Sequence, residues 1–207
     1  MKEPQTPFNE EERMELIRQL DILDTDAEEI YDGITYLASM ACNKPVSTIT
    51  IIDRHRQWFK SIVGANEKEN PRIYSFCAHA ILGNEILEVK DSQLDERFKD
   101  NPLVTGDPHV RYYAGAPIEL KDGLRVGTLC VIDHKPNKLS DEQLKILRFL
   151  SLQVTKLLEL RLKVKEVEIL RENDRNLVSM LTHELRNPLT SVSGYLSMIN
   201  QIKKISR

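Results

Sequence analysis

The chain has 207 residues, of which 41% are hydrophobic and 29% charged, and its formal net charge is −3. This composition predicts a folded chain of one or two domains and excludes disordered and fibrous proteins. The small net charge, with acidic and basic residues intermixed, gives no indication of nucleic acid as a partner. No apolar run approaches the roughly 18 residues needed to cross a bilayer, and no signal peptide is visible, so we expect a cytoplasmic protein without a membrane span.

The number and spacing of the cysteines limit the disulfide and metal chemistry that the chain can have. Cys42, Cys77 and Cys130 are widely spaced, and their number is odd. This pattern favours reduced thiols over a disulfide framework. Because the sequence lacks paired metal-ligand spacing, we expect no metal site, and core packing is a stronger interpretation of Cys77, His79 and Cys130 than metal binding.

The N-terminal part predicts two amphipathic helices. The first begins after Asn9 with an acidic turn and continues with apolar residues at helical spacing. The second helix is expected to end before Pro45. Its predicted apolar stripe consists of Ile30, Ile34, Leu37 and Ala41.

From Val46 onward the pattern becomes that of strands. Residues 46–53 and 57–64 read as one hairpin, and residues 86–91 as a third strand. Residues 112–120 and 125–133 form a second hairpin, because Asp122-Gly123 suits a tight turn with positive φ angles. A short helix near 75–82 and a long polar loop near 94–110 separate the hairpins. Antiparallel hairpins flanked by helices predict the α+β class, with an antiparallel sheet of about five strands.

One very long helix is predicted at the C-terminal end. Ser140 and Gln143 have the spacing of a capping box, and neither proline nor glycine follows before Pro188. At roughly 1.5 Å per residue this stretch would be on the order of 70 Å long, too long for the interior of a small domain. We therefore expect a parallel two-stranded coiled coil, the alternative being a helix packed on its own domain. Its predicted seam consists of Leu147, Leu150, Val154, Leu157, Leu160, Val164 and Val167.

The stretch LTHELRNPL, residues 181–189, combines reactive side chains with a proline. Helical geometry places His183 about 200° from Leu181 and therefore on the water-facing side of the seam. Glu184 could accept a hydrogen bond from one imidazole nitrogen and act as general base, which leaves the other nitrogen as a nucleophile. Asn187, one turn further on, could orient a water for hydrolysis. Because the apolar spacing continues beyond Pro188, we interpret this proline as a hinge rather than a helix end.

The sequence THELRNPLT, residues 182–190, resembles the phosphoacceptor box of bacterial sensor histidine kinases. The resemblance implies that His183 is the phosphoacceptor, Glu184 its proton acceptor, Asn187 the polar residue of the phosphatase reaction and Pro188 the kink. It also implies a homodimer through the C-terminal helix and a response regulator receiver domain as partner. No nucleotide-binding motif occurs in the chain. ATP and Mg²⁺ are therefore expected only with a separate catalytic domain, which could act in trans.

Most of the remaining chain resembles GAF sensor domains, through RQLDILDT, RQWFKSIVG, SFCAHAIL, DERFKDNPLV, YYAGAPIEL and GTLCVID in that order. The resemblance implies a pocket for an unidentified small molecule, or a purely dimerising module. A tetrapyrrole chromophore is not expected, because an alanine stands between the cysteine and the histidine of SFCAHAIL. The candidate ligand-binding residues are Cys77, His79, Arg97, Arg111 and Tyr113.

The expected organisation is a GAF-like sensor domain at 1–158, a coiled-coil linker at 159–177 and an incomplete first phosphoacceptor helix at 178–207. Two functions stay open. The chain is either the sensory and phosphoacceptor part of a two-component sensor histidine kinase, or a non-catalytic GAF module for dimerisation or ligand binding with a vestigial His183. Three alternatives stay open for its origin: the chain is part of a longer kinase, a stand-alone phosphoacceptor served by another kinase, or a degenerate remnant that only dimerises. Without a catalytic domain, the chain alone is expected to be inactive as a kinase.

Overall fold

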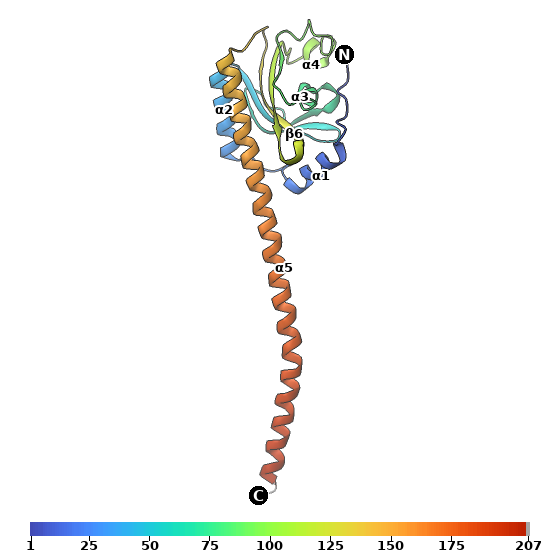
Figure 1. Ribbon diagram of the computed structural model, residues 1–207, viewed down its shortest axis with the longest axis vertical. Helices are drawn as coiled ribbons and strands as arrows, with labels where there is room; N and C mark the ends of the chain where they lie inside the picture. Colours follow the sequence, from blue (N-terminus) through green and yellow to red (C-terminus); the bar gives the residue numbers. More distant parts are fainter. Residues whose placement is uncertain (206–207) are drawn as a thin grey trace. The chain divides into compact units, whose positions relative to one another are not determined.

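The computed structural model describes the backbone of residues 1–205 and the side chains of residues 1–178 and 180–182. The chain forms two compact units, Met1–Arg161 and Leu162–Arg207. The first unit has the predicted α+β architecture, and the second consists of the continuation of helix α5 (Asp141–Ile205) (Figure 1). None of the helices in the described part of the chain is long and apolar enough to cross a membrane. The boundaries of the three predicted segments stay a prediction.

One antiparallel sheet forms the centre of the first unit. Its spatial strand order is β3-β2-β1-β6-β5-β4, and every neighbouring pair is antiparallel. The five predicted strands are confirmed. The sixth, β3, was missed because three residues at a sheet edge are too few to show alternation. The strands are β1 (Val46–Ile52), β2 (Arg56–Val63), β3 (Glu69–Pro71), β4 (Leu87–Val89), β5 (Tyr112–Glu119) and β6 (Arg125–Asp133).

Helices cover both faces of this sheet (Figure 1). α2 (Glu29–Cys42) packs on β1, β2 and β6, while α3 (Phe76–Ala80) packs on the opposite face of β1, β5 and β6. α1 (Glu10–Leu20) precedes them, and α4 (Pro102–Thr105) lies in the predicted polar loop. Two 3₁₀ turns occur at Arg72–Tyr74 and Lys121–Gly123. In the second turn Asp122 and Gly123 have φ angles of 60° and 74°, which confirms the predicted positive-φ turn.

The apolar stripe predicted for α2 is wrong by about one residue. Ile30 and Leu37 are 53% and 54% exposed, whereas the buried positions are one residue further along, at Tyr31, Thr35, Ala38 and Cys42. Both sets recur at helical spacing. The sheet selects the set that contains small side chains, because these allow the helix axis to approach the strands closely.

The start of α5 confirms the capping box. Ser140 Oγ accepts from the Gln143 backbone N–H at 3.2 Å, and Gln143 Oε1 accepts from the Ser140 backbone N–H at 3.0 Å. The coiled-coil prediction is wrong for the first turns, because Leu147 and Val154 are completely buried in the core of the first unit. There the alternative, packing on its own domain, is correct.

Further along α5 the predicted seam is open to solvent. Leu160 is 57% exposed, and Val164 and Val167 are 48% and 46% exposed. Apolar side chains at coiled-coil spacing with this exposure are available for a partner helix. Their pairing stays a prediction.

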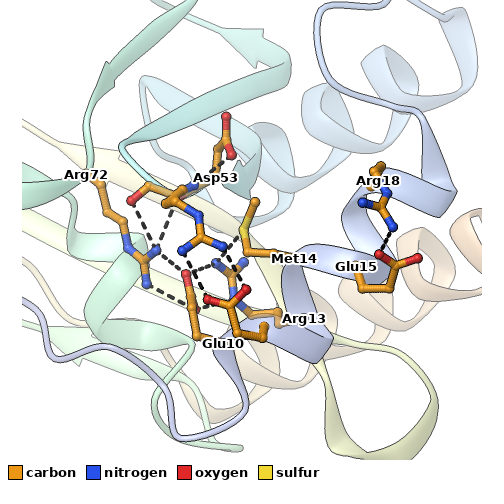
Figure 2. Close-up of polar contacts among 9 residues, drawn as sticks. Glu10, Arg13, Met14, Glu15, Arg18, Asp53 and Arg72 are labelled. Atoms are coloured by element: carbon orange, nitrogen blue, oxygen red, sulfur yellow. Dashed lines mark hydrogen bonds and ion pairs between the residues drawn. The ribbon is translucent and has the colours of Figure 1, made fainter.

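A buried ion cluster fixes α1 to the sheet (Figure 2). Arg13 donates to both carboxylate oxygens of Glu10, from Nε at 2.9 Å and from Nη2 at 2.8 Å, and its Nη1 donates to the Ile52 carbonyl. Arg72 also donates to Glu10 and contacts the carbonyl of Asp53. Two guanidinium groups thus share one carboxylate where the β1–β2 turn meets α1. This gives the N-terminal helix a defined place against the sheet.

Candidate functional site

Helix α3 positions the first functional side chain, Cys77. The buried Ser75 caps this helix, since its Oγ accepts from the Ala78 backbone N–H at 2.9 Å. The same hydroxyl donates to Gln57 Oε1 on β2 at 2.5 Å. The start of α3 is therefore fixed to the sheet, and Cys77 lies against β6.

Two thiols face each other between α3 and β6. The sulfur atoms of Cys77 and Cys130 are 3.8 Å apart. On the far side of Cys130, Thr48 Oγ1 lies 3.0 Å from the sulfur and 2.7 Å from Thr50 Oγ1. Since residues two apart on a strand share a face, β1 and β6 present these groups to the same side of the sheet. A continuous chain of hydroxyl and thiol groups results.

Two further buried hydroxyl groups belong to this cluster. Tyr113 Oη and Thr128 Oγ1 are enclosed, and neither has a partner of normal hydrogen-bond geometry among the described residues. An unpaired buried hydroxyl is costly, and a redox or catalytic role is one of the recognised explanations for it. We call this group the hydroxyl–thiol cluster; its members are Thr48, Thr50, Cys77, Tyr113, Thr128 and Cys130.

The surroundings distinguish the two thiols electrostatically. Burial acts to raise the pKa of Cys77, but hydrogen bonding to its sulfur from Cys130, Thr128 and Tyr113 outweighs burial and lowers the pKa. Cys130 has the largest lowering effect, and the contacts of Tyr113 and Thr128 fall short of normal hydrogen-bond geometry. The hydrogen bond with Cys77, together with burial, holds the pKa of Cys130 well above its usual range. The two thiols therefore differ in the direction in which their surroundings shift the pKa.

A cavity of about 180 Å³ connects the cluster to the surface. Cys77, Tyr113 and Cys130 form part of its wall and are buried, whereas Glu67, Asp107 and His134 also line it and are exposed. One water needs about 10–15 Å³ on the same measure, so the cavity has room for a small molecule. Most of the remaining wall is apolar, formed by Phe59, Phe76, Leu103, Val110 and Ile132.

The predicted ligand-binding residues fall into two groups. Cys77 and Tyr113 meet in this cavity, whereas His79, Arg97 and Arg111 do not line it. The His79 ring packs edge-on against Phe98, with the centroids 4.9 Å apart, and its Nε2 is 3.2 Å from the Lys2 carbonyl. Arg97 and Arg111 form ion pairs with Asp95 and Asp91. The structure thus does not bring the five residues together, and a ligand-binding role for each stays a prediction.

Sequence reasoning assigned Cys130 to core packing and overlooked Thr48 and Thr128. A signal was present, because Thr128 and Cys130 alternate with apolar residues in a strand that is buried on both faces. A hydroxyl and a thiol on one face of such a strand indicate a polar feature within the core. Among the described residues, no group of three or more His, Cys, Asp and Glu side chains is arranged to hold a metal ion.

The second candidate site lies on α5. His183, Glu184, Asn187 and Pro188 belong to this helix, but their side chains lie outside the described residues, so their predicted roles stay predictions. The helix does not end at the proline, since α5 continues to Ile205. Just before this stretch, Thr182 Oγ1 donates to the Val178 carbonyl at 2.8 Å.

Two family models match the chain. The GAF domain model matches residues 22–158, and the His Kinase A (phospho-acceptor) domain model matches residues 173–205. The second match includes all four candidate residues of α5.

Similar proteins give the same fold with different named activities. A cyclic di-GMP phosphodiesterase from Pseudomonas aeruginosa is 43% identical over 136 residues, which are 66% of this chain and 23% of that protein. The chain thus spans about a quarter of that relative's length. The GAF domain of an Acinetobacter phosphoenolpyruvate-protein phosphotransferase has a TM-score of 0.55 at 18% identity, covering 70% of this chain and 90% of that one.

A domain assigned to a two-component sensor histidine kinase of Sinorhizobium meliloti has a TM-score of 0.52 at 14% identity, covering 68% of this chain and 96% of that one. At such identity these structures support the fold alone. The fold and the larger family match agree: the chain belongs to the GAF domain family, and its residues 173–205 match the phospho-acceptor domain model of histidine kinases.

Proposed function

We propose that this chain is the sensory and phosphoacceptor part of a two-component sensor histidine kinase. The cavity of the first unit receives a small-molecule signal, and His183 receives the phosphoryl group, with Glu184 as general base and Asn187 as the residue that orients water for hydrolysis. Pro188 is the hinge of the helix. ATP and Mg²⁺ come with a separate catalytic domain.

The observation that carries this proposal is the span of α5. The same helix contributes Leu147, Val154 and Leu158 to the core of the first unit and contains residues 173–205 of the phosphoacceptor match. Because Leu147, Val154 and Leu158 are buried in the core of the first unit, repacking of that core has a mechanical route into α5. Packed cores respond to such changes by shifting between discrete arrangements.

Dimerisation through α5 is the second part of the proposal. The exposed Leu160, Val164 and Val167 provide a seam for a second copy of the chain. A paired helix presents two histidines to a donor domain and to a receiver-domain aspartate. The phosphorelay then runs from ATP to His183 and from His183 to the response regulator.

Phosphorylation in trans tests this proposal. The chain is incubated with radiolabelled ATP and Mg²⁺, alone and with an intact sensor histidine kinase. We expect label only with the kinase present, and its loss in His183→Gln. The matched control is His55→Gln, which removes an exposed histidine of the first unit and should leave labelling unchanged. Equal labelling of wild type and His183→Gln would refute the proposal.

The alternative is a non-catalytic GAF module that dimerises or binds a ligand, with a vestigial His183. It is favoured by the 43% identity to a protein whose named activity is that of a cyclic di-GMP phosphodiesterase and not of a kinase. The same variant separates the two functions. A cellular response that survives His183→Gln while the dimer stays intact would support the module.

A further inference from the structure

The paired thiols of the hydroxyl–thiol cluster have a geometry that simple core packing does not require. Their sulfur atoms, 3.8 Å apart, belong to a helix and a strand 53 residues apart in sequence. A disulfide needs about 2.05 Å between the sulfurs, so an approach of about 1.8 Å would close the bond. Because α3 has only five residues, a small shift of this helix together with side-chain rotation can supply that approach.

The cavity gives the pair a route to solvent. Both sulfur-bearing residues line it, although their exposed fractions are only 4% and 1%. A molecule the size of hydrogen peroxide fits in this space, while a large oxidant does not. Tyr113 lines the same cavity, and its buried hydroxyl, which has no partner of normal hydrogen-bond geometry among the described residues, can donate to a bound oxygen atom.

We propose that Cys77 and Cys130 form a reversible thiol–disulfide site whose oxidising substrate is a small peroxide. In the first step the Cys77 sulfur attacks one peroxide oxygen. An S–O bond forms, the O–O bond breaks, and the leaving oxygen takes the thiol proton and departs as water. The Cys77 sulfur is thereby oxidised by two electrons to a sulfenic acid, and the peroxide is reduced.

In the second step Cys130 resolves the sulfenic acid. Its sulfur attacks the Cys77 sulfur, an S–S bond forms, and the S–O bond breaks. The departing oxygen takes the Cys130 proton and leaves as a second water. Two thiols and one hydrogen peroxide thus give one disulfide and two waters, and a dithiol reductant reverses the change. The lowered pKa of Cys77 fits the attacking role, and the raised pKa of Cys130 fits the resolving role.

This site supplies a signal for the sensor. Disulfide formation draws α3 toward β6, and the Cys130 sulfur loses its S–H, so that it can then only accept from the Thr48 hydroxyl. The effect on His183 rests on the proposed function, whereas the thiol chemistry does not. The two claims can therefore be tested separately on the same protein.

The thiol chemistry is tested by treating the folded full chain with hydrogen peroxide and counting free thiols after denaturation. We expect the count to fall from three to one per chain, with a peptide cross-linked between Cys77 and Cys130, and to return to three with dithiothreitol. Three surviving thiols, or a cross-link to Cys42, would overturn the proposal.

Cys42→Ser is the matched control, because Cys42 is equally buried but lies on α2, and burial raises its pKa to about 11. This variant should form the same disulfide. Cys130→Ser should instead leave a sulfenic acid on Cys77 that dimedone captures when it is added together with the denaturant, and absence of that adduct would contradict the assigned roles. His183 labelling in trans should differ between oxidised and reduced chain; equal labelling would overturn oxidation as the signal. No labelling of either form would count against the proposed function alone.

Discussion

The buried ion cluster of α1 allows the energetic value of one carboxylate to be measured against a matched neighbour. In Glu10→Gln, the two guanidinium groups of Arg13 and Arg72 lose their shared counter-charge. Glu15→Gln is the control, since Glu15 is in the same helix and pairs with Arg18, but at an exposed position (Figure 2).

The expected loss of stability depends on the contacts that Arg13 and Arg72 keep after the substitution. Removing one partner of a buried ion pair typically costs about 3–5 kcal/mol. Glutamine keeps one acceptor, and Arg13 and Arg72 keep their contacts to the carbonyls of Ile52 and Asp53, so we expect the lower end, about 3 kcal/mol. The exposed pair should contribute no more than about 0.5 kcal/mol. For a protein of this size, the Glu10 substitution should lower Tm by about 6–12 °C.

Acid titration of stability gives an independent check. Burial acts to raise the pKa of Glu10, but the hydrogen bonds and charges of Arg13 and Arg72 together outweigh burial and lower it. The ionised carboxylate therefore stabilises the fold above its unfolded pKa of about 4.3, and this contribution is lost as pH falls through the lower folded value. The free energy of unfolding of Glu10→Gln should therefore lack this part of the pH dependence.

The assay is urea unfolding followed by circular dichroism at pH 7 and at several pH values below 5. The free energies of unfolding of wild type and both variants are compared with one common slope of free energy against urea concentration. Equal effects of Glu10→Gln and Glu15→Gln, or a Glu10 effect below about 1 kcal/mol, would refute the reasoning from burial.

Other positions give further predictions. Gly33→Ala on α2, whose new Cβ meets nothing within 4 Å, should stabilise the fold by about 0.5–1 kcal/mol. Gly127→Ala, whose new Cβ would lie 1.8 Å from the Thr50 carbonyl oxygen, should destabilise the fold by about 3 kcal/mol. Thermal unfolding of the two variants measures both effects. Ser140→Ala removes the acceptor of the capping box and should cost about 1 kcal/mol in the same assay, with Ser140→Asp largely restoring it. Val164→Lys combined with Val167→Lys should yield a monomer in analytical ultracentrifugation without changing the Tm of the first unit, and a dimer that persists would count against pairing through α5.

The sequence predicted the strands, the hairpin turn and the start of α5 because each carries a local signal. Alternation marks the strands, Asp122-Gly123 marks the turn, and Ser140 with Gln143 marks the helix start. The buried face of α2 could not be chosen in this way. Two adjacent stripes fit the same spacing, and only packing against the sheet separates them.

The two candidate sites differ in the same way, because one has a local sequence signal and the other depends on tertiary packing. A motif of nine contiguous residues identified the phosphoacceptor segment, since its chemistry lies within two turns of one helix. The cavity is built from residues far apart in sequence, and Cys77 and Cys130 meet only after α3 has packed on β6. Arg97 and Arg111 were predicted as candidate ligand-binding residues, but each pairs with an aspartate outside the cavity. Pairing of this kind is a property of the folded loop.

The central claim is that the chain accepts a phosphoryl group on His183. The most direct measurement is to phosphorylate the chain in trans with an intact sensor histidine kinase and to map the modified residue by mass spectrometry at neutral pH, where phosphohistidine survives. We predict that the phosphoryl group is found on His183 and on none of the other four histidines. A phosphoryl group on another residue, or an unmodified chain beside an active kinase, would contradict the account.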